Sequence, residues 1–137
     1  MKKINKSILN GIIELIMWDL SGVNIAVDIV KLYYLDNKPP GDIALNLNVN
    51  KTHIKYYIIS IRKASGNNRF TAYRAIKLYM SLRERVKPII MSNQCIICNK
   101  LFKNKAASRS HVYRTHRELV YLTIRQVIEG LCVVGST

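Results

Sequence analysis

Apolar side chains in the first third of the chain recur at intervals of three or four residues. They stand at Ile8, Ile12, Leu15, Ile16, Ile25, Ile29, Leu32 and Tyr33. This spacing places them on one side of a helix, so it predicts two helices, over about residues 8–20 and 24–36. Ser7 is suited to cap the first helix, and the pair Ser21-Gly22 separates it from the second.

Proline and glycine divide the rest of the pattern. Residues 39–41, Pro-Pro-Gly, form a break, because proline stops a helix and favours an extended conformation in the residue before it. After this break the pattern predicts helices over about 42–47, 51–63 and 70–87, the last ending near Pro88. Residues 118–134 fit a helix, although their β-branched content leaves a strand open.

Two of these short helices carry a more specific pattern. Residues 42–63 fill the motif I-A-x-x-L-x-V-[SN]-x-x-x-I-x-x-x-I with Ile43, Ala44, Leu47, Val49, Asn50, Ile54 and Ile58. This segment resembles a helix-turn-helix, in which a small residue such as Ala44 lets the two helices cross closely. Asn48 replaces the usual glycine of the turn, because Asn tolerates left-handed backbone better than other side chains. Asn50 is placed to cap the second helix.

The second helix of this motif is expected to contact DNA. Its buried side, marked by Ile54 and Ile58, leaves a polar and basic face that carries Lys51, Thr52, Lys55, Tyr56, Arg62 and Lys63. In the helix-turn-helix family the second helix enters the major groove. The first four of these residues are therefore expected to read bases, and the last two to contact phosphates. A wingless domain is favoured, and a wing over residues 64–73 remains open.

Cysteine and histidine spacing predicts a metal centre. Cys95, Cys98, His111 and His116 follow the pattern C-x2-C-x12-H-x4-H. A tight turn between two cysteines presents both thiolates to one ion, and two histidines about one helical turn apart present both imidazoles from one helix face. We expect these four residues to bind one Zn²⁺.

Residues 93–117 resemble a single C2H2 zinc finger. The resemblance implies a small ββα fold with Phe102 in its core, and it places Asn104 at a base-facing position of the finger helix. Nearby cations are expected to contact phosphates, among them Lys103, Lys105 and Arg109. One departure from the family is Ser108, which stands where a bulky apolar residue is usual. The finger core should therefore be small and depend strongly on zinc.

Together, these elements indicate a mainly α protein in three parts. A helical domain with the helix-turn-helix covers residues 1–90, a ββα zinc finger covers 91–117, and a helical or extended segment covers 118–137. The chain of 137 residues is long enough to bury a core.

The charge of the chain points to a polyanionic partner. Lys and Arg number 22 against 8 Asp and Glu, which gives a formal net charge of +14. Residues 37–92 carry eleven basic and two acidic side chains, whereas residues 1–36 carry four of each. A basic surface outside a neutral N-terminal third is the electrostatic pattern of a nucleic-acid-binding protein.

Several other classes are disfavoured. The apolar stretch after the basic N-terminus is interrupted by polar residues, so neither a signal peptide nor a membrane span is expected. Three cysteines, two of them closely spaced, do not suit a secreted disulfide scaffold. No paired carboxylates, glycine-rich phosphate loop or nucleophile motif is present, so neither an enzyme nor a small-molecule substrate is expected. We expect an intracellular protein, in the host cytoplasm if viral.

These observations predict a sequence-specific binder of double-stranded DNA that regulates transcription. Its abundance of Ile, Lys, Asn and Tyr resembles small DNA-binding proteins of archaeal viruses and plasmids. A homodimer, through the neutral N-terminal helices or the apolar C-terminal segment, is one way to reach specific affinity. Two alternatives stay open: a nonspecific nucleic-acid packaging or RNA-binding protein, and a zinc-finger module that binds another protein.

Overall fold

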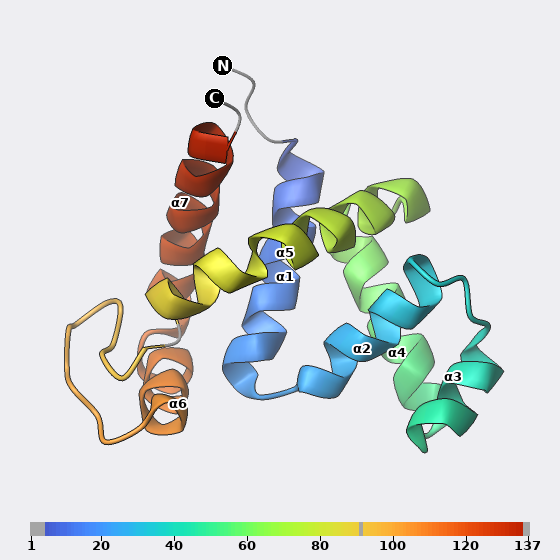
Figure 1. The fold of residues 1–137 in the computed structure, drawn as a ribbon, viewed down its shortest axis with the longest axis horizontal. Coiled ribbons are helices and arrows are strands. Elements are labelled where there is room, and N and C mark those ends of the chain that lie inside the picture. The colour runs from blue at the N-terminus through green and yellow to red at the C-terminus, as the bar shows by residue number, and fades with distance from the viewer. Residues whose placement is uncertain (1–4, 91, 136–137) are drawn as a thin grey trace. The chain divides into compact units, whose positions relative to one another are not determined.

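The computed structural model describes residues 5–90 and 92–135. Seven helices make up 77% of the described residues (Figure 1). This agrees with the predicted mainly α class. The chain divides into two compact units, of which one spans Asn5–Tyr79 and the other begins at Met80.

The first unit is a small helical domain. It contains α1 (Lys6–Ser21), α2 (Asn24–Tyr34), α3 (Pro40–Leu47), α4 (Lys51–Ala64) and the first half of α5 (Arg69–Ile90). Helix α4 packs against α1, α2 and α3, and in Figure 1 it crosses α2. The core is dominated by isoleucines with no exposed surface, namely Ile12, Ile13, Ile29, Ile54, Ile61 and Ile76. The predicted positions of α1 are all buried. In α2 the prediction is only partly right, because Ile29 is buried but Ile25 is exposed and Leu32 and Tyr33 are half-buried. The buried face of α2 instead includes Ala26, Val30 and Tyr34.

The start of α1 differs from its prediction. Asn5, not Ser7, caps the helix, because its side-chain Oδ1 accepts hydrogen bonds from the backbone N–H groups of Ser7 (2.8 Å) and Ile8 (3.3 Å). Asn and Ser are both favourable N-cap residues. Which of them caps α1 depends on the residue at which the helix begins. At the other end Gly22 adopts left-handed backbone with φ 83°, which ends α1 as predicted.

Helix α1 approaches α5 closely at Gly11. A Cβ atom built on Gly11 would lie 2.7 Å from Ala75 Cβ and would also collide with the hydroxyl of Ser65. Farther along α1, the buried carboxylate of Asp19 accepts a hydrogen bond from the Tyr79 hydroxyl of α5. The absence of a side chain at residue 11 therefore allows this helix pair to pack at short range.

We expect Gly11→Ala to destabilise the protein. Overpacking a full core costs about 1–3 kcal/mol, and alanine recovers about 1 kcal/mol through its helix propensity, so the net loss is up to about 2 kcal/mol. Urea unfolding measures this change. The matched control is Gly130→Ala in the C-terminal helix, where an added Cβ meets nothing within 4 Å. The control should gain stability through helix propensity alone, and if Gly11→Ala gained as much, the α1–α5 packing described here would be wrong.

The second unit contains the end of α5, a loop, α6 (Lys105–Thr115) and α7 (Arg117–Gly135). Helix α6 packs against α7. The C-terminal segment, for which both helix and strand were open, is thus helical. Its side chains Val120, Ile124 and Ile128 are fully buried, with the i, i+4, i+8 spacing of a helix face.

The predicted ββα finger is wrong in its β part. Within the described residues the only β pairing is a single antiparallel bridge between Gln94 and Leu101. Helix α5 does not end near Pro88, as predicted, but continues through it to Ile90. A proline so near the end of a helix forfeits only one hydrogen bond that the last turn would make.

Candidate metal centre and nucleic-acid interface

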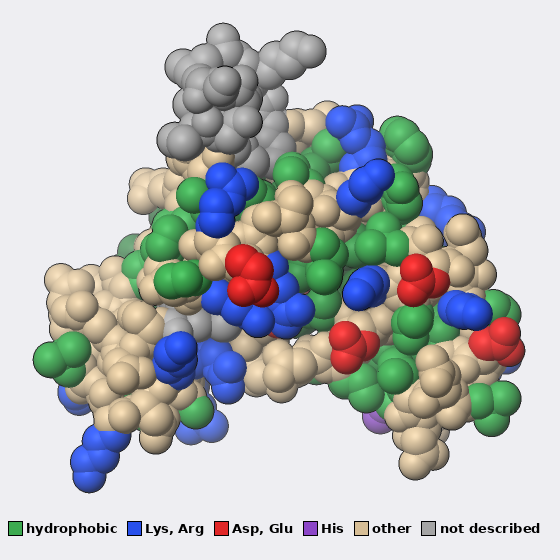
Figure 2. Space-filling model, in the orientation of Figure 1, with side chains coloured by type: hydrophobic (Ala, Val, Ile, Leu, Met, Phe, Trp, Pro, Cys, Tyr) green, Lys and Arg blue, Asp and Glu red, His purple; other side chains and the backbone are tan. Residues whose placement is uncertain are grey.

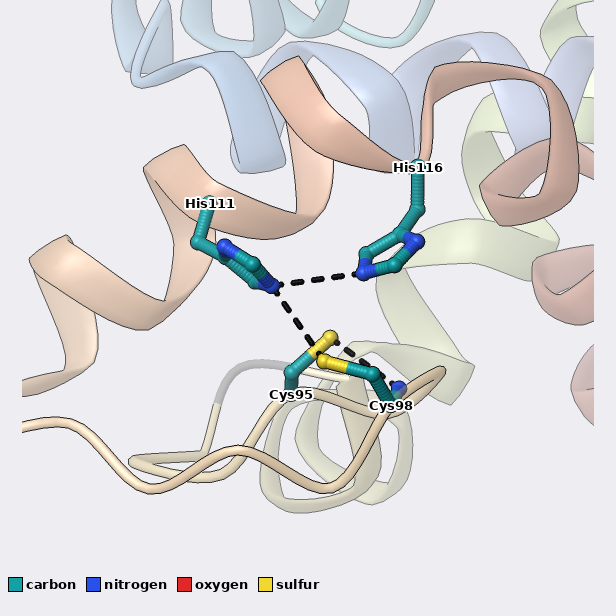
Figure 3. A group of neighbouring side chains, drawn as sticks. All are labelled: Cys95, Cys98, His111 and His116. Carbon is teal, nitrogen blue, oxygen red and sulfur yellow. Dashed lines mark hydrogen bonds between the residues drawn. The ribbon is translucent and has the colours of Figure 1, made fainter.

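Four predicted ligands converge in the second unit. Cys95 and Cys98 lie in the loop before α6, His111 lies on α6, and His116 directly follows it. One ligand atom from each of the four lies within 4.8 Å of the others. Figure 3 shows both imidazole rings pointing from α6 and its end toward the two sulfur atoms of the loop. These four residues can hold a metal ion.

The distances fit a tetrahedral ion. Zinc bonds of about 2.0–2.1 Å to nitrogen and about 2.3 Å to sulfur place ligand atoms about 3.3 Å (N to N) and about 3.6 Å (S to N) apart. The two histidine Nε2 atoms are 3.2 Å apart. Cys98 Sγ lies 3.3 Å from His111 Nε2. These two pairs of ligand atoms are therefore within about 0.3 Å of the spacing that such an ion requires.

A tight turn positions the two cysteines. Asn99 ends this turn with left-handed backbone, φ 63°, and its N–H donates to the carbonyl of Cys95 at 2.9 Å. The N–H groups of Ile97 and Cys98 point to Cys95 Sγ, at 3.4 and 3.5 Å. Cys95 is fully buried. Donors aimed at a buried sulfur fix its orientation and support it as a metal ligand.

The surroundings of His111 favour metal binding through Nε2. Its other ring nitrogen, Nδ1, lies 3.4 Å from the hydroxyl of Thr115. A hydrogen bond there fixes the ring and leaves Nε2 to face the cysteines. Desolvation, together with the charges of His116 and Lys100, lowers the pKa of the His111 imidazole. The neutral form that this favours is the one that coordinates metal.

The core around the four ligands is small. The half-buried Phe102 ring lies 4.8 Å from the His111 ring, measured between centroids. Val112 is fully buried, and Ser108 is buried with no hydrogen-bond partner for its hydroxyl. An unsatisfied hydroxyl contributes no favourable burial energy at the position where a finger has a bulky apolar side chain. Apolar packing alone is therefore a weak source of stability here.

In the first unit, α3 and α4 have the local geometry predicted for residues 42–63. Asn48 ends α3 with left-handed backbone, φ 54° and ψ 48°. The Asn50 side chain caps α4 by accepting a hydrogen bond from the N–H of Thr52 at 2.8 Å. Both local predictions are confirmed. Residues 65–67 form a turn and α5 begins at Arg69, so this region is helical and not a wing.

The buried face of α4 is anchored to α2 as well as to the core. Ile54, Ile58 and Ile61 are buried. The Tyr34 hydroxyl of α2 donates a hydrogen bond to the carbonyl of Ile58 at 2.8 Å. Burial raises the pKa of Tyr34 to about 12, so this hydroxyl keeps its proton and remains a donor at neutral pH. The orientation of α4, and hence of its outer face, is well defined.

The outer face of α4 presents the residues predicted to contact DNA. Lys51, Thr52, Lys55 and Tyr56 are exposed, as is Lys63, and Arg62 is half-buried. Tyr56 keeps 63% of its surface accessible, which is high for a large aromatic side chain. The chain has no Asp or Glu between Asp42 and Glu84. The helix therefore offers hydrogen-bond donors to a polyanion without an acidic neighbour along its own segment.

The residues predicted to contact DNA from the finger have different roles. Lys103, Asn104 and Lys105 are exposed at the start of α6, and Arg109 is half-buried. Asn104 caps α6, because its Oδ1 accepts a hydrogen bond from the N–H of Ala107 at 2.8 Å. Only its NH2 group is left for a partner.

The cations of residues 70–87, which the sequence suggests as phosphate contacts, form a second basic surface, but sequence analysis missed the aromatic rings paired with them at the start of α5. Arg74 lies over the ring of Phe70, with its guanidinium carbon 5.9 Å from the centroid, and Lys77 Nζ lies 5.8 Å from that of Tyr73. Figure 2 shows Lys and Arg side chains interleaved with hydrophobic ones over these turns. Each pair spans four residues, so the i, i+4 spacing of an aromatic residue and a cation is the signal that identifies this surface.

No family model, curated protein or solved structure matches this chain. None of the helices in the described part of the chain combines the length and the apolar character that a bilayer span requires.

Proposed function

We propose that this chain is a sequence-specific DNA-binding protein that regulates transcription, with α3 and α4 acting as a helix-turn-helix. The observation that carries the proposal is the left-handed turn at Asn48, followed by a capped helix whose outer face is polar and basic. Its partner is double-stranded DNA, and it needs no catalytic residue.

Helix α4 has suitable chemistry for the major groove. Its first two turns present Lys51, Thr52, Lys55 and Tyr56. The N-terminal residues of a recognition helix are the ones that reach base edges. Lysine donates to the O6 and N7 acceptors of guanine, and threonine hydrogen-bonds bases or contacts the thymine methyl group. Arg62 and Lys63, in the last turn, suit phosphates.

We further propose that the ion held by Cys95, Cys98, His111 and His116 is Zn²⁺. Two thiolates and two imidazoles in tetrahedral array are the donor set that zinc prefers. Four protein ligands leave no open position for a substrate, so the ion's role is structural. Because Asn104 is engaged in capping α6, contacts from Lys103, Lys105 and Arg109 to phosphates suit this element better than base recognition.

Selection from random duplex DNA tests the proposed function. We expect the zinc-loaded protein, at about 150 mM salt, to enrich a defined sequence motif. A palindromic motif with half-sites about 34–36 Å apart would further indicate a dimer. Retention of all duplexes without enrichment would contradict sequence-specific recognition and favour packaging. A protein that retained no duplex at all would contradict DNA binding altogether.

A further inference from the structure

The first unit has a surface pocket that the proposed helix-turn-helix does not use. It lies between the end of α2 and the start of α5, has a volume of about 430 Å³, and is lined by Tyr34, Asn37, Arg69, Phe70 and Tyr73. Three of these five side chains are aromatic, one is a cation and none is a carboxylate. The volume falls within the range of about 300–1,000 Å³ that is typical of small-ligand sites.

Two of the three aromatic side chains in this pocket, those of Phe70 and Tyr73, are accessible to a ligand. Phe70 is one of only two phenylalanines in the chain and is 65% exposed. Its ring and that of Tyr73 are nearly parallel, with an interplanar angle of 20° and centroids 6.3 Å apart. An exposed phenylalanine adds little to the core, so its contribution to stability does not explain its position. Two nearly parallel rings offer π faces to a flat partner.

Cations surround these rings. The Arg69 guanidinium carbon lies 5.0 Å from the Tyr33 ring centroid, and its NH1 group lies 3.4 Å from the Tyr33 hydroxyl. This double contact holds Arg69 at the edge of the pocket. Arg74 lies over Phe70. An aromatic platform flanked by arginines is the combination that binds an unpaired base through stacking and its phosphates through charge.

We propose that this pocket binds an unpaired base of a single-stranded nucleic acid. The base stacks on Phe70 and Tyr73, the side-chain amide of Asn37 is available to its polar edge, and Arg69 and Arg74 contact the adjoining phosphates. A paired base inside a duplex is stacked on both sides and presents no free face to such a platform. The site shares no residue with the proposed recognition face of α4, so the two activities are separable.

The test uses the full zinc-loaded chain and a short fluorescein-labelled single strand, read by anisotropy. Phe70→Leu removes the π face and keeps an apolar side chain of similar size, and because Phe70 is exposed the fold should survive. Loss of one base–aromatic stack should weaken single-strand binding by about 5- to 150-fold. Phe70→Trp, which restores a π face, should bind as the wild type does. A labelled duplex should bind all three proteins equally.

Matched controls make the result decisive. Tyr121→Leu removes another exposed aromatic ring, on α7, and should leave single-strand affinity unchanged. DNA and RNA strands of one sequence, measured in parallel, show whether the base belongs to DNA or to RNA. Weaker binding of either single strand by Phe70→Leu, with duplex binding unchanged, supports the proposal. It is overturned if Phe70→Leu binds single strands as tightly as the wild type, if Phe70→Trp is as weak as Phe70→Leu, or if duplex binding falls equally.

Discussion

Replacing His116 with alanine should cost the protein its zinc and the ordered structure of residues 92–116. Zinc binding contributes about 10–16 kcal/mol to the folding of zinc-finger peptides at neutral pH. Fully burying one apolar side chain contributes about 1.5–3 kcal/mol, and in α6 only Val112 is an apolar residue buried to that degree. Helix α6 has 11 residues, below the about 12–15 at which isolated helices become even marginally stable. The ion therefore dominates the stability of this region.

Metal analysis and amide hydrogen exchange measure this result. The wild type should contain one zinc per chain, and His116→Ala should contain none. Exchange in His116→Ala should accelerate over residues 92–116 and remain slow in the core of α1 and α4. The matched control is His53→Ala, which removes the one histidine outside the cluster, an exposed residue of α4. A His116→Ala protein with a full zinc content would contradict the four-ligand centre.

Replacing both Lys51 and Lys55 with alanine should weaken duplex binding by about 30-fold or more, since each well-placed contact to a base contributes about 1–3 kcal/mol. The dependence of log affinity on log salt should also flatten, by up to about 2, because fewer counterions are released from the DNA. Fluorescence anisotropy over a series of salt concentrations measures both quantities. Asn50 still caps α4 in this variant, so the helix should remain folded.

A matched double variant distinguishes an effect of the position of the lysines on α4 from an effect of the lost positive charge. Lys31→Ala with Lys38→Ala removes the same two charges from exposed sites of the first unit that lie outside α4. This variant should bind duplex DNA almost as the wild type does. Equal losses in the two double variants would mean that binding follows net charge, as expected of a packaging protein, and that α4 has no special role.

The helices of the first unit could be predicted because local signals and burial agree there. The isoleucine spacing marked the face of α4 that is buried, and Asn48 and Asn50 have local chemistry that determines a turn and a cap. The start of α1 was ambiguous, because two residues near it can act as the N-cap. Asn5 and Ser7 are both good caps, and the helix used the earlier one.

In the second unit, the spacing of the zinc-finger motif predicted the positions of the ligands but not the secondary structure around them. The four ligands converge as the spacing predicts, because a tight turn holds the two cysteines and α6 with its C-cap holds the two histidines. The ββ hairpin is reduced to one bridge, between Gln94 and Leu101, and the spacing of the ligands alone did not indicate this. The pocket beside Phe70 could not be predicted from periodicity, since it requires side chains of α2 and α5 that only tertiary packing brings together.

The central claim, that α4 reads base pairs, is tested most directly by repeating the random-duplex selection with a Thr52→Ala variant. Thr52 is exposed and uncharged, so the variant keeps the net charge of the protein and its general attraction to DNA. The account predicts continued retention of DNA with a motif altered at one or two adjacent base pairs, whereas Lys103→Ala, outside α4, should return the wild-type motif. A wild-type motif that returned unchanged with Thr52→Ala, or altered equally with Lys103→Ala, would contradict base recognition by α4.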